Sequence, residues 1–95
     1  MKEELFNMPK LVYSESDIRD ECDCLTLNAK KFEIVSKLIQ DIQPKKILDI
    51  GVGTGIFYSK YLPEYLEKKS IYGVDVQQEF LNIATQRGVH TTKVN

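Results

Sequence analysis

The 95-residue sequence has no tryptophan, only two cysteines and three prolines, and no apolar run of membrane-spanning length. A transmembrane helix needs about 18 or more consecutive apolar residues, so the sequence does not predict one. Charge of one sign is also missing, because thirteen basic and fourteen acidic residues leave a net charge of −1. No strong field therefore draws the chain to nucleic acid or to anionic lipid.

The two cysteines, Cys22 and Cys24, are too few for a disulfide framework and have no second pair at metal-ligand spacing. The first ten residues, MKEELFNMPK, contain no apolar stretch of the kind found in secretory signals. We therefore expect a cytoplasmic protein without a metal site. Hydrophobic residues make up 42% and charged residues 28% of the chain, which is typical of one globular domain or part of one.

The hydrophobic pattern divides the chain at residue 28. Residues 1–27 show no sustained period, and we interpret them as an N-terminal lead-in, either a short solvated helix or a loose segment. From residue 28 onward the spacing of apolar residues predicts a helix over 28–42, capped by Asn28 and ended by Pro44. The apolar residues that share one face of this helix are Phe32, Val35, Leu38, Ile39 and Ile42.

After this helix, short apolar runs alternate with amphipathic segments. The pattern predicts strands over 47–50, 71–76 and 89–94 and helices over 56–69 and 78–87, with a break near Leu62 because Pro63 must start a new first turn. The expected inward residues of the two helices are Phe57, Tyr61, Tyr65, Leu66, Phe80, Leu81, Ile83 and Ala84. The order predicts an α/β fold with a Rossmann-like parallel sheet and flanking helices, the first β-α-β-α-β half of a doubly wound domain.

The most informative segment is ILDIGVGTG, residues 47–55, at the end of the first strand. Gly51 permits a sharp turn, Gly53 lets the backbone approach a ligand, and Gly55 lets the next helix pack closely on the sheet. Asp75 follows twenty positions after Gly55, at the end of the next strand, where a carboxylate can accept hydrogen bonds from both hydroxyls of a ribose. The alternative roles are a packing turn for the glycines and a helix cap for Asp75.

The segment ILDIGVGTG followed by YGVDV resembles motif I and the acidic second-strand motif of class I S-adenosylmethionine-dependent methyltransferases. The resemblance covers about residues 28–95 and implies S-adenosyl-L-methionine as the cofactor. The glycines would shape the loop against its methionine part, Asp49 would approach its amino group, Asp75 would hold the ribose and Val76 would lie against the adenine. The implied cofactor-binding residues are Asp49, Gly51, Gly53, Gly55, Asp75 and Val76.

Two other functions stay open at this point. A dinucleotide-binding oxidoreductase has the fingerprint G-x-G-x-x-G, whereas this chain has G-x-G-x-G followed by Ile56. Asp49 would also lie close to a pyrophosphate and repel it. The other alternative is a non-catalytic S-adenosylmethionine-binding or interaction module. The resemblance to the methyltransferases implies that the residues that bind the methyl acceptor lie outside this sequence, so no catalytic residue is assigned.

Half of a doubly wound sheet leaves strand 47–50 at an open edge, which is an aggregation hazard when the strand is apolar. We expect either a fragment of a longer methyltransferase or an edge covered by another copy or another protein. The isolated chain is therefore predicted to be a homo-oligomer or to aggregate.

Overall fold

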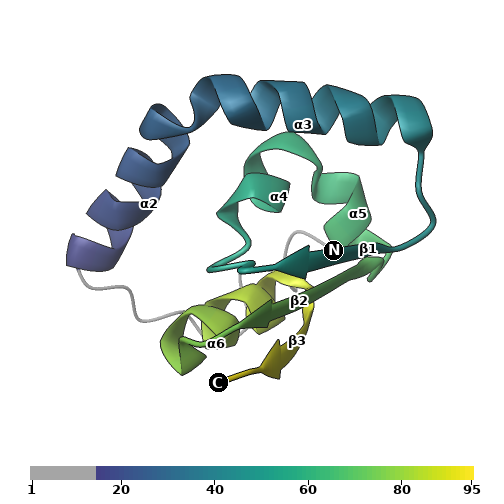
Figure 1. The fold of residues 1–95 in the computed structure, drawn as a ribbon. Coiled ribbons are helices and arrows are strands. Elements are labelled where there is room, and N and C mark those ends of the chain that lie inside the picture. Colours follow the sequence, from purple (N-terminus) through teal and green to yellow (C-terminus); the bar gives the residue numbers. More distant parts are fainter. Residues whose placement is uncertain (1–14) are drawn as a thin grey trace, which may run out of the picture.

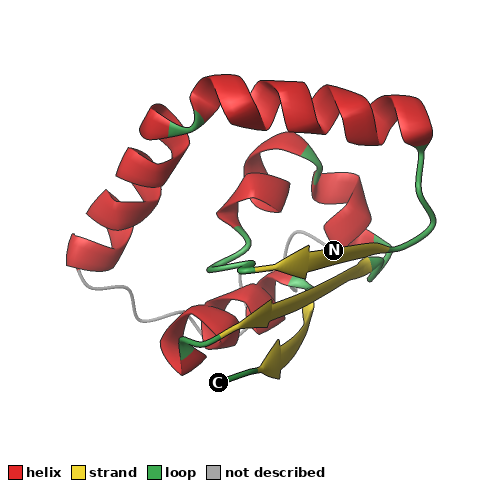
Figure 2. Cartoon of the chain, in the orientation of Figure 1, coloured by secondary structure: helices red, strands yellow, loops and turns green. Residues whose placement is uncertain are grey.

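The computed structural model describes residues 15–95, with side chains from residue 20 onward (Figure 1). The elements follow the order α2 (Glu15–Leu27), α3 (Ala29–Ile42), β1 (Ile47–Ile50), α4 (Ile56–Tyr61), α5 (Pro63–Glu67), β2 (Ile71–Asp75), α6 (Gln78–Arg87) and β3 (His90–Lys93) (Figure 2). The three strands are parallel in the order β1-β2-β3, which confirms the predicted α/β class. Within residues 15–95, no helix is both long and apolar enough to cross a membrane.

The hydrophobic core lies between the sheet and the helices that follow β1 and β2. Its buried members come from α4, α5, α6, β2 and the segments beside them: Val52, Tyr58, Leu62, Tyr65, Leu66, Ile71, Leu81, Ala84 and Val89. The largest fully buried side chains are Leu62, Ile71 and Leu81. Burial of such residues is the main favourable term in folding, so this side of the sheet stabilises the domain.

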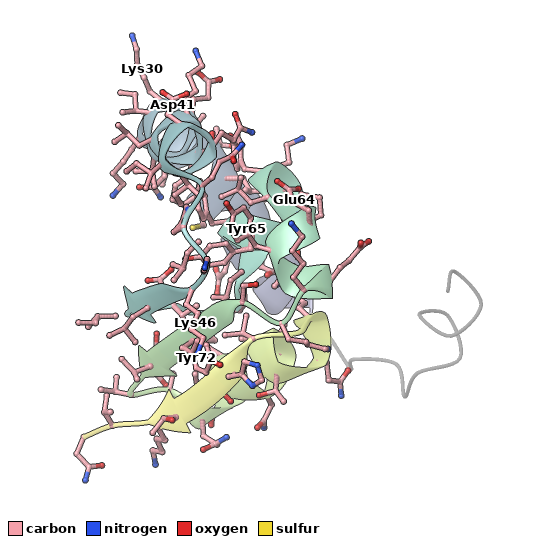
Figure 3. The ribbon with its side chains drawn as sticks, turned by 90° about the vertical axis from the view of Figure 1, so that its right-hand side faces the viewer. Lys30, Asp41, Lys46, Glu64, Tyr65 and Tyr72 are labelled. Carbon is pink, nitrogen blue, oxygen red and sulfur yellow. The ribbon has the colours of Figure 1, made fainter. Side chains whose placement is uncertain are left out.

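Within the described residues, the opposite face of the sheet is bare. Leu48 and Ile50 on β1 are 68% and 80% exposed, because side chains alternate between the two faces and these two point away from the helices. Tyr72 lies next to Leu48 in register, and its ring stacks on His90 of β3 with centroids 4.6 Å apart. Figure 3 shows α5, which carries Glu64 and Tyr65, on one side of the strands, and no helix of residues 15–95 on the other side.

Helix α3 ends at the predicted residue and begins one residue later than the predicted 28. It buries less of its apolar face than the periodicity suggests. Its aromatic contact is to α4, where the rings of Phe32 and Phe57 are 4.9 Å apart, and Ile39 packs against the core. Leu38 and Ile42 remain 53% and 70% exposed, since α3 packs on α2 and α4. Periodicity shows which residues share a helix face, but it does not show how much of that face a neighbour covers.

Asn28 marks the start of α3, but the prediction that its side chain caps the helix is wrong. Its side-chain amide instead donates to the carbonyl of Cys24 at 2.9 Å, and its backbone N–H donates to the same oxygen at 3.1 Å. The cause is α2, which runs up to Leu27 and supplies these acceptors at the junction. The lead-in is thus helical over Glu15–Leu27.

The break near Leu62 is confirmed, with φ −141° at Leu62 between α4 and α5 and Pro63 in the first turn of α5. Helix α6 buries Leu81 and Ala84 as predicted. Phe80 does not point inward as predicted, because it is 37% exposed and borders the pocket described below. Gly88 ends α6 in the left-handed conformation with φ 116°.

The open edge predicted for strand 47–50 is present, because β1 pairs only with β2 within residues 15–95. Ile47 donates its N–H to Ser70 and Gly51 donates to Val74, both on the β2 side. Since N–H directions alternate along a strand, the N–H groups of Leu48 and Ile50 point to the open edge. This edge therefore offers backbone donors and acceptors to another strand.

We expect the purified 95-residue chain to sediment as a dimer or a larger species at low micromolar concentration, because the β1 edge and the bare face are both apolar. Leu48→Pro removes one outward N–H without removing a bond to β2, so it should shift the chain toward monomer. Leu48→Ala is the matched control for the lost side chain. A compact monomer that melts cooperatively would contradict the expectation of self-association.

Candidate functional site

The glycine loop, residues 51–55, joins β1 to α4. Its three glycines have positive φ values of 82°, 61° and 75°, a region that other residues rarely adopt. A Cβ built on Gly51 or Gly53 would meet no atom within 4 Å, whereas one on Gly55 would lie 3.4 Å from Val89 and 3.7 Å from Ala84. Gly51 and Gly53 thus border open space, and Gly55 packs against the end of α6 and its connection to β3.

Val52 anchors the loop from its inner side. It is 9% exposed, and its side chain lies so close to Gly73 that a Cβ at that glycine would be 2.6 Å from it. The N–H groups of Gly51 and Val52 both donate to the carbonyl of Val74, at 2.8 and 3.0 Å. The loop is therefore held onto β2 by packing and by backbone hydrogen bonds.

Asp75 ends β2 directly beside the loop. One carboxylate oxygen accepts the N–H of Gly53 at 2.9 Å, and the other accepts the N–H of Gln77 at 3.0 Å. The second bond forms the local turn in which aspartate side chains often take part, just before α6 begins. Each oxygen can accept more than one hydrogen bond, so this local role leaves capacity for a ligand. Val76 follows and is 56% exposed.

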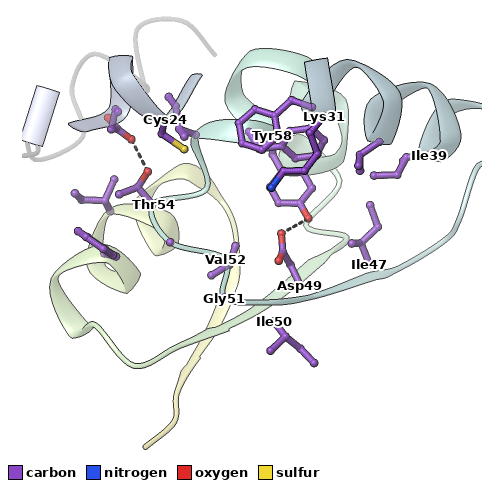
Figure 4. Close-up of a pocket in the computed structure, with 18 of the residues that line it drawn as sticks. Cys24, Lys31, Ile39, Ile47, Asp49, Ile50, Gly51, Val52, Thr54 and Tyr58 are labelled. Atoms are coloured by element: carbon purple, nitrogen blue, oxygen red, sulfur yellow. Dashed lines mark hydrogen bonds between the residues drawn. The ribbon is translucent and has the colours of Figure 1, made fainter. Parts of the chain in front are cut away.

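Asp49 is paired with a buried tyrosine. Its carboxylate accepts the hydroxyl proton of Tyr58 at 2.6 Å, and Tyr58 is only 3% exposed (Figure 4). Burial, followed by the hydrogen bond to Asp49 and the negative charge of that carboxylate, raises the pKa of Tyr58 well above its ordinary value. The phenol therefore stays protonated at physiological pH and orients the carboxylate of Asp49.

A pocket of about 530 Å³ lies between α2, α3, β1 and the glycine loop. Its wall is largely apolar, with the side chains of Phe32, Val35 and Ile39 from α3 and Phe57 from α4. The ionisable side chains on it are Asp20, Glu21, Cys24, Lys31, Asp49 and Tyr58. A mostly apolar pocket with a few polar groups is the usual form of a small-molecule site.

The structure brings some of the predicted residues together at this pocket and leaves others beside it. Asp49, Gly51 and Gly53 line the pocket. Asp75 does not line the pocket, but its carboxylate accepts a hydrogen bond from the N–H of Gly53 in the loop. Val76 and Gly55 also lie outside the pocket wall. The predicted residues therefore form one continuous region around the loop, with Asp49 at the apolar side and Asp75 on the neighbouring strand.

Three polar residues at the loop were not identified from the sequence: Glu21, Thr54 and Arg87. Arg87 and Glu21 form an ion pair with a shortest distance of 2.6 Å, and Arg87 also donates to the backbone carbonyl of Thr54 at 2.9 Å. The hydroxyl of Thr54 donates to the carboxylate of Glu21. Sequence offered one signal, Thr54 inside the glycine motif, but nothing that links Glu21 to a residue 66 positions away.

The described part of the chain contains no candidate metal site. Over residues 20–95, no group of three or more His, Cys, Asp or Glu side chains is placed to hold an ion. Cys22 and Cys24 are free thiols. His90 is exposed on the bare face, with Nε2 2.9 Å from the carbonyl oxygen of Lys69.

Comparison with known proteins identifies no relative of this chain. Family models, curated protein sequences and solved structures were searched with the chain, and none of them matches. The function is therefore inferred from the glycine loop, its two carboxylates and the adjoining pocket.

Proposed function

We propose that the chain is the cofactor-binding half of an S-adenosylmethionine-dependent methyltransferase. The observation that carries this proposal is the contrast among the glycines. A Cβ at Gly51 or Gly53 would project into empty space beside the pocket, whereas the protein itself requires a glycine at Gly73 and Gly88 for packing. No packing contact requires a glycine at position 53. The left-handed backbone there favours glycine, and a ligand that approaches the backbone would require it.

The charges around the loop favour a cationic ligand over a pyrophosphate. Among the described residues, the pocket wall carries three acidic side chains, Asp20, Glu21 and Asp49, and one basic side chain, Lys31. Glu21 is paired with Arg87. A pyrophosphate beside Asp49 would be repelled, while an ammonium or sulfonium group would be attracted. This charge pattern supports S-adenosylmethionine over a nicotinamide or flavin dinucleotide.

In the proposed complex, Asp49 accepts hydrogen bonds from the amino group of the cofactor while Tyr58 holds the carboxylate in place. Asp75 accepts the ribose hydroxyls with the lone pairs that Gly53 and Gln77 do not use. Val76 lies against the adenine. S-adenosylmethionine, when bound, supplies an activated methyl group. The apolar wall of the pocket lies beside Asp49 and would exclude water from the part of the site that holds the cofactor's amino group.

Isothermal titration calorimetry of the purified chain tests the proposal. We expect S-adenosylmethionine and S-adenosylhomocysteine to bind at one site per chain, and NAD⁺ to give no heat of binding. A chain that binds NAD⁺ and neither methionine-derived ligand would contradict the proposal in favour of a dinucleotide site. A folded chain that binds none of the three would show that the loop is a packing turn.

Asp75→Ala is expected to weaken the binding of S-adenosylhomocysteine by about 1.5–3 kcal/mol, the range for hydrogen bonds to a charged group. The variant also loses the acceptor for Gly53, so its thermal unfolding should be measured beside its affinity. Asp41→Ala, at an exposed position on α3, removes the same charge far from the loop and serves as the control. The ribose assignment fails if the folded Asp75→Ala chain binds as tightly as the parent.

A further inference from the structure

Arg87 joins three segments that are distant in the sequence. From the last turn of α6, its two terminal nitrogens donate to the two carboxylate oxygens of Glu21 on α2, at 2.6 and 3.1 Å. One of these nitrogens also donates to the carbonyl of Thr54 in the glycine loop at 2.9 Å. The Thr54 hydroxyl completes the group by donating to Glu21. We refer to Glu21, Thr54 and Arg87 as the loop clamp.

The loop clamp is more than a surface ion pair. The side chains of Arg87 and Glu21 are only 17% and 14% exposed, and the guanidinium meets the carboxylate with two parallel bonds. Such two-pronged pairs are stronger and more directional than exposed pairs, which contribute little. Lysine could not replace Arg87, because its ammonium group lacks the planar set of donors.

The clamp acts on the part of the loop that borders open space. Gly53 is held through its N–H by Asp75 on β2, and the next residue, Thr54, is held through its carbonyl by Arg87. Two consecutive loop residues are thus fixed by different elements. Asp20, Glu21 and Cys24 of α2 also line the pocket, so the same contacts hold α2 as one of its walls.

We propose that Glu21 and Arg87 are positioning residues for the glycine loop, and that helix α2 is therefore part of the ligand site. This inference rests on the proposed function, since the ligand that the loop receives is S-adenosylmethionine. Neither side chain is assigned a contact with the cofactor. They act by fixing the Thr54 carbonyl and the wall formed by α2, and misplacement of a binding loop by about 1 Å can cost a large factor in activity.

The decisive variant is the double substitution Glu21→Gln/Arg87→Met. It removes the two paired charges together, so neither is left without the other, and replacements of this kind are often neutral for stability. We expect its melting temperature to stay near that of the parent while its affinity for S-adenosylhomocysteine falls about tenfold or more. The paired control is Glu33→Gln/Lys37→Met, which likewise removes one carboxylate and one cation, at exposed positions of α3.

A second readout needs no ligand. Amide hydrogen exchange of the ligand-free chain should speed up at Thr54 and Gly55 in the double variant, while Leu81 and Ile71 in the core stay protected. Arg87→Lys should show the same change to a smaller extent, because a single ammonium group can replace only part of the planar set of guanidinium donors. A purely structural role would instead change exchange throughout the chain.

The outcomes separate this inference from the proposed function. If the parent binds no S-adenosylhomocysteine, the proposed function fails. Faster amide exchange confined to the loop of the double variant would still support the positioning role in that case. If the parent binds and the double variant keeps both the parental affinity and the parental loop exchange, the positioning role is overturned. Loss of affinity in the control variant as well would likewise contradict it.

Discussion

Replacing Gly53 by valine is expected to lower the affinity for S-adenosylmethionine by about 100-fold or more, on the order of 3 kcal/mol. The added side chain meets no protein atom within 4 Å of its Cβ, so it extends into the open space in front of the loop, where the ligand is proposed to bind. Helical circular dichroism should persist, because the helices make their contacts elsewhere. Calorimetry on the folded variant gives the result.

Backbone strain must be separated from blocking, because φ at Gly53 is 61° and β-branched residues disfavour this region. Gln43 provides the control, with φ 51° at the end of α3 and away from the loop. Gln43→Val should carry a similar conformational cost and leave ligand binding unchanged. If Gly53→Val binds as well as the parent, the loop serves packing and the proposed site is wrong.

Gly88→Ala is expected to reduce the free energy of unfolding by about 2–5 kcal/mol, through overpacking and a strained backbone together. Its φ is 116°, and a Cβ there would lie 2.8 Å from the carbonyl oxygen of Leu66. Because that atom belongs to the backbone of α5, a change of rotamer cannot relieve the contact. The loss is large for a small domain, whose total stability is typically about 5–15 kcal/mol.

Urea unfolding of Gly88→Ala beside Gly51→Ala isolates the packing part of this effect. Gly51 also has positive φ, at 82°, but a Cβ there meets nothing within 4 Å. Gly51→Ala should therefore show only the conformational cost, about 1–2 kcal/mol. Equal stability losses in the two variants would contradict the close packing of the end of α6 on α5.

Local rules were sufficient for much of the fold. The short apolar segment at 47–50, with two β-branched residues, indicates the strand. The glycines indicate the left-handed turn, and Pro63 indicates the break between α4 and α5. Gly88 at the end of α6 follows from the same rules. In each case the determining residues lie within a few positions of the structure that they specify, so the sequence carries the information directly.

Contacts between distant segments could not be predicted in this way. The pairing of Glu21 with Arg87 spans 66 positions, and each residue alone is indistinguishable from a solvated charge on a helix. The side-chain role of Asn28 was misread because α2, which supplies its acceptor, has no clear apolar period. Phe80 was assigned to the core because periodicity does not reveal that a pocket adjoins that helix face.

The sequence names candidate residues for the site but not the contacts that join them. The loop glycines and Asp75 are candidates because of their positions after β1 and at the end of β2, and Asp49 is a candidate because of the family resemblance. Their hydrogen bonds to Tyr58 and Gly53 depend on how α4 and β2 meet at the loop. That arrangement is a property of the packed core and has no signature in any single segment.

The most direct measurement of the central claim is an NMR titration of the ¹⁵N-labelled chain with S-adenosylhomocysteine, followed through its backbone amides. We expect shifts that saturate together at Gly51, Gly53 and Asp75, with Gly73 and Gly88 nearly unchanged because they are packed inside the protein. A spectrum that stays unchanged at saturating ligand, or one that shifts only away from the loop, would contradict it.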